Sequence, residues 1–214
     1  MGGRRRARYE ADRKVEVRGG GPRLGRLIRA HRVFRSVSVE FSADLLIRAY
    51  RNGYFPMAEP EEDGAIYWHA PDPRALMPIW EPEFSSNLLR RVRRRPFRVT
   101  TDRAFRAVMS ACADRPTTWI SDRMVEAYTE LNRRGHAHSV ECWQDGELAG
   151  GLYGVHVGGA FFGESMFYRV SNASKIALVY LTAMLREAAF DLHDIQYLND
   201  HTERFGGHEM RKQE

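Results

Sequence analysis

Apolar residues recur at helical spacing in several parts of the chain. Leu45, Leu46, Ala49 and Tyr50 follow Ser42 at intervals of three and four, which predicts a helix that ends at Gly53. The same spacing predicts three more helices, which begin at Ser85 or Ser86, at Thr101 or Asp102, and at Ser121-Asp122. A strongly apolar helix is predicted over residues 173–189. Residues 58–74, rich in Pro, Asp and Glu, predict an irregular loop with a short extended piece at Tyr67-Trp68-His69 inside it.

Alternating apolar and polar positions predict strands in the second half of the chain. Three such runs cover residues 139–143, 148–157 and 160–167, and the turn pairs Asp145-Gly146 and Gly158-Gly159 separate them. This order is typical of an antiparallel meander. Shorter strands are predicted over residues 97–101 and 192–198, and a last helix begins at His201. This order of elements predicts an α+β (mixed α/β) fold: helices come first, then a meander, a buried helix and a further strand.

Length and composition limit the class of protein. A chain of 214 residues fits one large domain, or a small domain beside a medium one. No apolar run approaches the roughly 20 residues that span a bilayer, so a membrane protein is not expected. No apolar signal core follows the N-terminal arginines, so we expect Cys112 and Cys142 to be reduced thiols in the cytoplasm.

Positive charge is concentrated in two places. The net charge is +5, but residues 1–35 alone carry +9 in a segment rich in Arg and Gly, which predicts a basic, disordered tail. This tail is compatible with RNA contact and equally with a solvated leader. A second cluster is dense enough to bind a polyanion such as a phosphate backbone, although charge runs are usually only solvated faces. It consists of Arg90, Arg91, Arg93, Arg94, Arg95 and Arg98.

Two carboxylates lie in apolar surroundings and are the best candidates for chemistry. Glu164 follows the apolar run 160–163, and Asp194 and Gln196 flank one isoleucine in a predicted strand. A carboxylate in an apolar segment costs free energy unless partners hold it. Residues two apart on a strand point to one face, so Asp194 and Gln196 form a polar pair. The alternative is an edge strand whose polar residues face solvent.

Other reaction classes find little support. His136, His138 and Cys142 suggest zinc, but no second close pair of ligands completes a tetrahedral set, and no metal is expected. Ser165 lacks the Gly-x-Ser-x-Gly context of a hydrolase nucleophile. No phosphate-binding glycine loop or dinucleotide fingerprint is present, so no cofactor is expected.

Several motifs resemble those of the bacterial leucyl/phenylalanyl-tRNA–protein transferase family. They occur in the family's order and cover about residues 40–207. The matching segments are Ala49–Pro56, Ala70–Ala75, Thr118–Ile120, Gly135–Glu141, Phe162–Phe167, Asn172–Lys175 and Leu198–His201. The resemblance implies a small N-terminal domain, here residues 36–74, and a larger domain over residues 75–214 that resembles acetyltransferases of the Gcn5-related fold.

The resemblance also implies an activity and its partners. Family members move Leu, Phe or Met from aminoacyl-tRNA to proteins with N-terminal Arg or Lys, which marks those proteins for degradation. We therefore expect a cytoplasmic, monomeric aminoacyltransferase. The hypothesis for the site is that Asp194 binds or deprotonates the incoming amine, Gln196 orients it at the carbonyl, and Glu164 faces the acceptor's cationic side chain or amine.

Further roles come only from the resemblance. Trp119 matches a position that stacks on the terminal adenosine of tRNA, and the arginine cluster would bind tRNA. The apolar pocket for the aminoacyl side chain would be lined by Leu152, Met166, Leu178, Leu181 and Leu185. Each of these five is nearly as well explained as ordinary core.

Some positions depart from the family pattern. Met57 stands where many members have Trp, and Leu181 and Leu185 replace aromatic residues of some relatives, which leaves the preference among Leu, Phe and Met open. Two alternatives remain at this point. An acetyl-CoA-dependent N-acetyltransferase would need a glycine-rich pyrophosphate loop, which the segment 171–174 lacks. A non-catalytic RNA-binding paralogue would rely on the basic segments alone.

Overall fold

The computed structural model describes residues 34–35, 41–62 and 64–212. The expected disordered tail of residues 1–35 lies outside these ranges except for Phe34–Arg35, which forms strand β1. Two β-sheets organise the described residues. Strand β1 belongs to a small antiparallel sheet of order β1-β3-β2, in which β2 covers Phe55–Glu59 and β3 covers Ala65–His69.

A larger sheet of seven strands forms the centre of the molecule, in the order β10-β4-β9-β8-β7-β6-β5. Its neighbours are antiparallel except β8 and β9, which run parallel because helix α5 connects them. The strands are β4 (Arg74–Leu76), β5 (Arg98–Thr101), β6 (Ala137–Gln144), β7 (Glu147–Val157), β8 (Ala160–Tyr168), β9 (Leu192–Gln196) and β10 (His208–Met210). The predicted meander is therefore confirmed as β6, β7 and β8.

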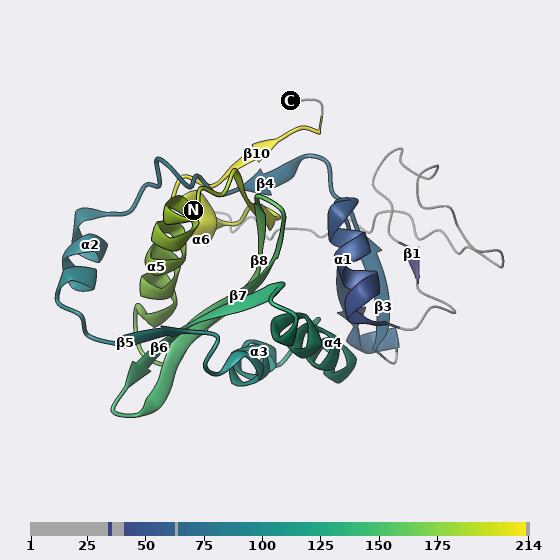
Figure 1. The fold of residues 1–214 in the computed structure, drawn as a ribbon, viewed down its shortest axis with the longest axis horizontal. Coiled ribbons are helices and arrows are strands. Elements are labelled where there is room, and N and C mark those ends of the chain that lie inside the picture. Colours follow the sequence, from purple (N-terminus) through teal and green to yellow (C-terminus); the bar gives the residue numbers. More distant parts are fainter. Residues whose placement is uncertain (1–33, 36–40, 63, 213–214) are drawn as a thin grey trace, which may run out of the picture.

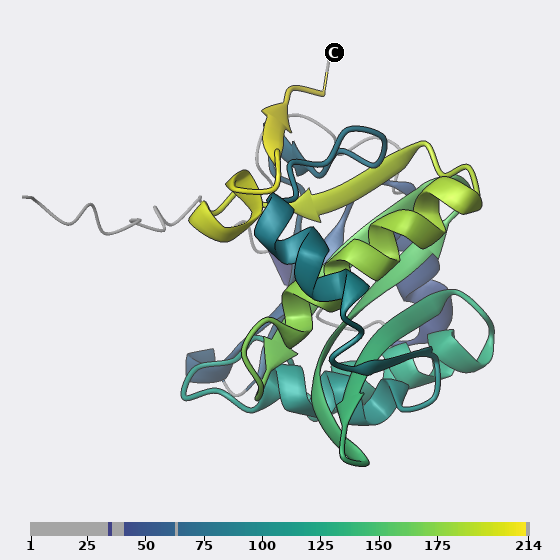
Figure 2. The same cartoon turned by 90° about the vertical axis from the view of Figure 1, so that its left-hand side faces the viewer.

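Helices cover both faces of the large sheet (Figure 1). On one face, α3 (Phe105–Ala113) and α4 (Asp122–Arg133) pack on the meander, and α1 (Ala43–Arg51) packs beside α4. On the other face, α5 (Ala173–Glu187) packs on β6, β7 and β8, and α2 (Ser86–Arg93) lies across α5 (Figure 2). The layers of helices and sheet confirm the predicted mixed α+β class. No helix in the described ranges has the length and apolar character needed to cross a bilayer.

A glycine lets α5 approach the sheet closely. A Cβ atom at Gly150 of β7 would lie 2.6 Å from the Cβ of Ala173 and 2.9 Å from the carbonyl oxygen of Phe167. Only a residue without a side chain fits between β8 and the first turn of α5. This contact fixes the start of the helix that connects β8 to β9.

One hydrophobic core joins α1 and the small sheet to the large sheet. It contains Tyr50 and Trp68 together with Val108 and Tyr153, all of which are buried. A second core lies between the large sheet and α5. The predicted boundary between residues 36–74 and 75–214 falls inside β4, and the division into two domains stays a prediction.

Two local predictions were wrong. The extended piece predicted at Tyr67–His69 is confirmed as the end of β3, but the rest of residues 58–74 is less irregular than predicted. It contains the start of β3, the end of β2 and a 3-10 turn at Pro60–Glu62, because apolar Ile66 is buried in strand pairing. Helix α3 has its N-cap at Ala104 instead of Thr101 or Asp102, since the Asp102 carboxylate accepts a hydrogen bond from the backbone N–H of Ser139 (2.9 Å). The predicted last helix is confirmed: α6 (Asp200–Glu203) begins one residue before His201, and it is a single turn that β10 follows.

The ladder between β8 and β9 is short. It pairs Ala160 with Leu192, Phe161 with His193, and Phe162 with Asp194, and no later pair follows in the described chain. Beyond this point β9 pairs with β4, where Gln196 faces Ala75. The residues after Phe162 in β8 therefore meet β9 only through side chains, and Glu164 and Gln196 are among them.

Candidate active site

The Glu164 carboxyl is surrounded by hydrogen-bond donors from three elements. The hydroxyl of Tyr50, on α1, donates to Glu164 Oε1 at 2.7 Å, and the side-chain amide of Gln196, at the end of β9, donates to the same oxygen at 3.1 Å. Tyr50 and Tyr128, on α4, share a further hydrogen bond of 2.5 Å between their hydroxyls. Glu164 keeps partial exposure, so it is held in place and still within reach of a ligand.

The surroundings of Glu164 make it an unusually good base for a carboxylate. Burial raises its pKa to about 8; the Tyr50 hydrogen bond acts in the opposite direction, and the charge of Asp194 adds to the rise. Burial also raises the pKa of Tyr50 and Tyr128 well above the usual range, so both phenols remain hydrogen-bond donors at neutral pH. A carboxyl that titrates near 8 suits proton transfer to or from an amine.

Asp194 is buried and paired with an arginine that the sequence hypothesis did not include. Arg74 Nε lies 2.9 Å from the Asp194 carboxylate, and the two side chains are 15% and 6% exposed. Arg74 Nη1 also donates to the carbonyl of Gly53 at 2.8 Å. Because β9 lies between β4 and β8, the alternative of a solvent-facing edge strand is wrong.

Gln196 connects the two carboxylates. Its backbone N–H donates to Asp194 Oδ1 at 2.8 Å, and its side-chain amide reaches Glu164. Gln196 has a positive φ of 60°, a conformation that costs a non-glycine residue some free energy. The Asp194 hydrogen bond holds this strained residue, so the three residues proposed from the sequence form one connected group.

The residues proposed for the apolar pocket also come together. Leu152 of β7 and three leucines of α5 are buried in the core between the sheet and α5, and Met166 of β8 packs at its partly exposed border. The three leucines are Leu178, Leu181 and Leu185. Trp119 lies elsewhere, against the other core, and its carbonyl accepts a hydrogen bond from Ala58 N–H of β2 at 2.9 Å.

The arginine cluster forms an exposed basic surface on α2 and the start of β5. All six side chains are exposed, and none makes an ion pair with an acidic residue in the described ranges. The Arg98 guanidinium lies over the ring of Trp143, 5.7 Å from its centroid. The members are Arg90, Arg91, Arg93, Arg94, Arg95 and Arg98.

Known protein families match almost all of this architecture. A family model described as leucyl/phenylalanyl-tRNA protein transferase matches residues 76–214, and one for the N-terminal domain of the same enzyme matches residues 39–72. The chain belongs to the leucyl/phenylalanyl-tRNA protein transferase family.

Curated relatives agree with the family models. A leucyl/phenylalanyl-tRNA–protein transferase of Salinibacter ruber is 62% identical over 167 residues, which are 78% of this chain and 74% of the relative. One from Gloeobacter violaceus is 49% identical over 82% of this chain and 91% of the relative. Among solved structures, L-PGS from Bacillus licheniformis is similar with a TM-score of 0.39 and 12% identity, over 78% of this chain and 54% of that chain.

The side chains considered for zinc binding and for serine hydrolysis have other partners in this transferase family member. His138 hydrogen-bonds Asp102 and His156, while the Cys142 thiol donates to the carbonyl of Ala173. Within the described ranges, no group of three or more His, Cys, Asp or Glu could hold a metal ion. Ser165 accepts a hydrogen bond from Arg115 and has no histidine partner there.

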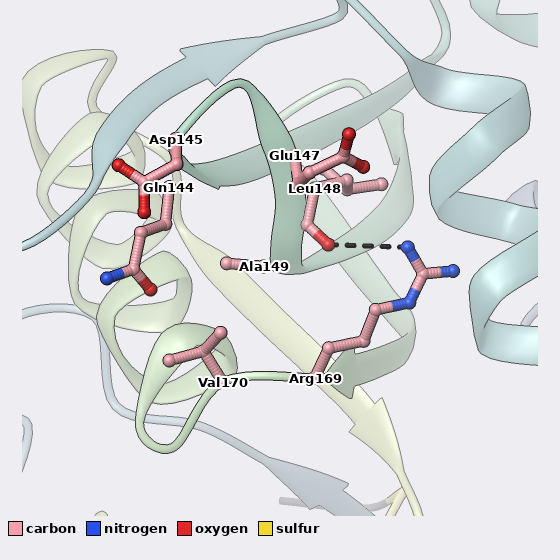
Figure 3. A pocket seen from close by; sticks show the side chains of 7 residues that line it. All are labelled: Gln144, Asp145, Glu147, Leu148, Ala149, Arg169 and Val170. Carbon is pink, nitrogen blue, oxygen red and sulfur yellow. Dashed lines mark hydrogen bonds between the residues drawn. The ribbon is translucent and has the colours of Figure 1, made fainter.

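A pocket on the surface lies away from the proposed site. It has a volume of about 420 Å³ and lies beside the turn between β6 and β7, where Asp145, Glu147 and Arg169 line it (Figure 3). The Arg169 guanidinium points back to the carbonyl of Leu148 at 3.4 Å (Figure 3). None of the residues proposed for this transferase's chemistry lines it.

Sequence reasoning missed three residues that hold the site together: Tyr50, Arg74 and Tyr128. Tyr50 and Arg74 lie in segments that match the family motifs, so a motif match was the available signal for them. For Tyr128, the sequence showed only a position on the apolar face of a predicted helix, which is typical of a core residue. Their importance appears when the fold places their polar atoms against Glu164 and Asp194.

Proposed function

We propose that this chain transfers leucine, phenylalanine or methionine from aminoacyl-tRNA to the α-amine of proteins that begin with Arg or Lys. Family membership supports transfer from aminoacyl-tRNA to protein. The observation that carries the site assignment is the connected group of Glu164, Gln196 and Asp194. It offers one base with a raised pKa beside a fixed amide.

The reaction is the aminolysis of an ester. The α-amine attacks the carbonyl carbon, a C–N bond forms, and the C–O bond to the tRNA ribose breaks. The amine loses a proton to the Glu164 carboxylate, and the released ribose hydroxyl gains one. An α-amine titrates at about 7.7–8.0, so its basicity matches that of Glu164, and positioning supplies much of the remaining barrier lowering.

Asp194 acts by positioning in this proposal. The sequence hypothesis gave it direct contact with the amine, but Arg74 already occupies its carboxylate. We infer that Asp194 holds the backbone of Gln196, so that the Gln196 amide is aimed at Glu164 and at the substrates. Glu164 then both receives the cationic N-terminus of the acceptor and takes its proton.

The remaining assignments belong to the same proposal. The aminoacyl side chain enters beside Met166, the partly exposed member of the leucine-lined core, and Trp119 stacks on the terminal adenosine. The separate family model for residues 39–72 supports a small N-terminal domain beside a larger one. That the larger domain resembles acetyltransferases is part of the proposal. The enzyme would act in the cytoplasm as a monomer and mark its acceptors for degradation.

A transfer assay tests the proposal. Radiolabelled Leu-, Phe- and Met-tRNA are offered separately with peptides that differ only in an N-terminal Arg, Lys or Ala. We expect label in the Arg and Lys peptides, because a cationic N-terminal residue complements Glu164, and little in the Ala peptide. Tight tRNA binding without any transfer would favour a non-catalytic RNA-binding protein, and acetylation of the peptide by acetyl-CoA would favour the acetyltransferase alternative.

The arginine surface makes a separate prediction about tRNA affinity. Replacing Arg91 and Arg94 by Glu should weaken tRNA binding and reduce its salt dependence, because each lost phosphate contact lowers the slope of log affinity against log salt by roughly 0.7–0.9. Binding measured at several salt concentrations gives this slope. Each replacement is also made singly, and Arg123→Glu is the matched control for the single variants, since it makes the same charge change at an exposed position of α4. An equal loss for Arg123→Glu would mean that net charge alone is responsible.

A further inference from the structure

The loop between α3 and α4 brings an arginine to the strand that carries Glu164. Arg115 Nη2 donates to the carbonyl of Met166 at 2.7 Å and to the hydroxyl of Ser165 at 3.2 Å. Ser165 directly follows Glu164 in β8. The loop is fixed at both ends, because Arg115 N–H donates to Ala113 and Ile120 is buried. A guanidinium is therefore held one to two residues from the proposed base.

The Arg115 side chain is exposed, and in the described part of the chain no carboxylate neutralises its charge. Both of its hydrogen bonds to described residues use Nη2, so no described residue occupies the Nη1 and Nε groups of the planar guanidinium. A fixed guanidinium with donors to spare suits the bidentate binding of a phosphate.

A buried hydroxyl beside Arg115 also lacks a partner. Tyr153 of β7 is directly opposite Ser165 in the sheet, so the two side chains share a face. The Tyr153 hydroxyl is fully buried, and no described residue hydrogen-bonds it. Buried hydroxyls nearly always have a partner, and a water molecule can serve as one where the described residues supply none. The hydroxyl has no access to solvent, so the inference below rests on Arg115 and not on Tyr153.

We propose that Arg115 binds the phosphodiester that precedes the terminal nucleotide of the aminoacyl-tRNA. This inference rests on the proposed function. The reactive ester is attached to the terminal ribose, and the phosphate is attached to the other side of the same ribose. When the ester faces Glu164 and Gln196, the phosphate lies one sugar away. Arg115 is anchored at Met166, two residues from Glu164 in β8, which is at most about 7 Å along the strand because the register between β7 and β8 shifts at Glu164.

The test compares donors with and without that phosphate. Arg115→Gln and Arg115→Lys are assayed with phenylalanyl-adenosine, which has no phosphate, and with a CCA trinucleotide charged with phenylalanine. We expect Arg115→Gln to raise the KM for the charged trinucleotide by about tenfold to a hundredfold and to leave that for phenylalanyl-adenosine unchanged. Arg115→Lys should lose less than Arg115→Gln, because the lysine ammonium keeps the positive charge but cannot form two parallel hydrogen bonds with a phosphate.

Two further measurements keep the outcome clear. Uncharged CCA and adenosine are tested as competitive inhibitors of the charged donor. Their inhibition constants compare a ligand that has the phosphodiester with one that lacks it, without any turnover of either. Arg106→Gln, at an exposed position of α3, controls for net charge. An equal loss with both donors would show that Arg115 only supports β8, and no loss with either would also overturn the inference. Failure of the wild-type protein to transfer from any charged donor would instead overturn the proposed function, and this inference with it.

Discussion

Replacing Glu164 by Gln should lower transfer to an Arg-initiated peptide by about 10²-fold near pH 9, and by much less near pH 6.5. Burial raises the pKa of Glu164 to about 8, so the carboxyl is mostly protonated at pH 6.5 and ionised at pH 9. Only the ionised form can take a proton. The amine must lose one when the C–N bond forms, even where it is neutral beforehand. Steady-state rates over this pH range, with saturating donor, measure the change in the defect.

Glu147→Gln is the matched control, because it makes the same change at the exposed start of β7. A Glu164→Gln defect of constant size from pH 6.5 to pH 9 would contradict the role as base and leave only positioning.

The same residue, Glu164, predicts how the stability of the protein changes with pH. Its pKa is raised on folding, so its contribution to stability is full below about 4.5 and is lost as the pH rises through about 8. The Gln variant should therefore lose less stability than the wild type over this range.

Replacing Arg74 by Met should reduce the free energy of unfolding by about 3–5 kcal/mol, because it leaves Asp194 buried without its counterion. The same change removes the hydrogen bond to Gly53, at the end of the turn after α1. Urea denaturation followed by fluorescence measures the loss. Transfer activity should also fall, since Asp194 holds Gln196 in its strained conformation.

The double variant Arg74→Met with Asp194→Leu separates stability from activity. Removing both charges should recover much of the stability, while transfer remains low because Gln196 has lost its anchor. Arg106→Met is the control for an exposed pair, since Arg106 and Glu126 are 58% and 70% exposed and should contribute at most about 1 kcal/mol. An Arg74→Met protein with wild-type stability would mean that the ion pair is not important for the fold.

Local sequence patterns were sufficient for the meander, for α5 and for most helix ends. The alternation around Asp145-Gly146 and Gly158-Gly159 predicts β6, β7 and β8 closely, because turn chemistry and burial agree there. The pattern also placed Asp194 and Gln196 side by side. Between residues 58 and 74 it found only the extended piece at Tyr67–His69, because Pro and acidic residues suggested a loop around it, although Ile66 is also a buried strand residue.

The contacts that complete the site could not be predicted in this way. Tyr50 is 114 positions from Glu164, and Arg74 is 120 positions from Asp194. Periodicity reports which side of an element is buried, but it does not report which distant element supplies the partner. The raised pKa of Glu164 likewise depends on the packing of α1, α4 and β9 around one carboxyl, and no local segment contains that information.

The hydrogen bond from Tyr50 to Glu164 joins parts of the chain that a ribosome makes at different times. Helix α1 is complete early in synthesis, whereas β8 and β9 are made near its end. A nascent chain is surrounded by charged tRNA, which is the donor of the proposed reaction. Because no single segment contains the complete group, we expect an unfinished chain to leave that tRNA untouched and to become reactive only after release.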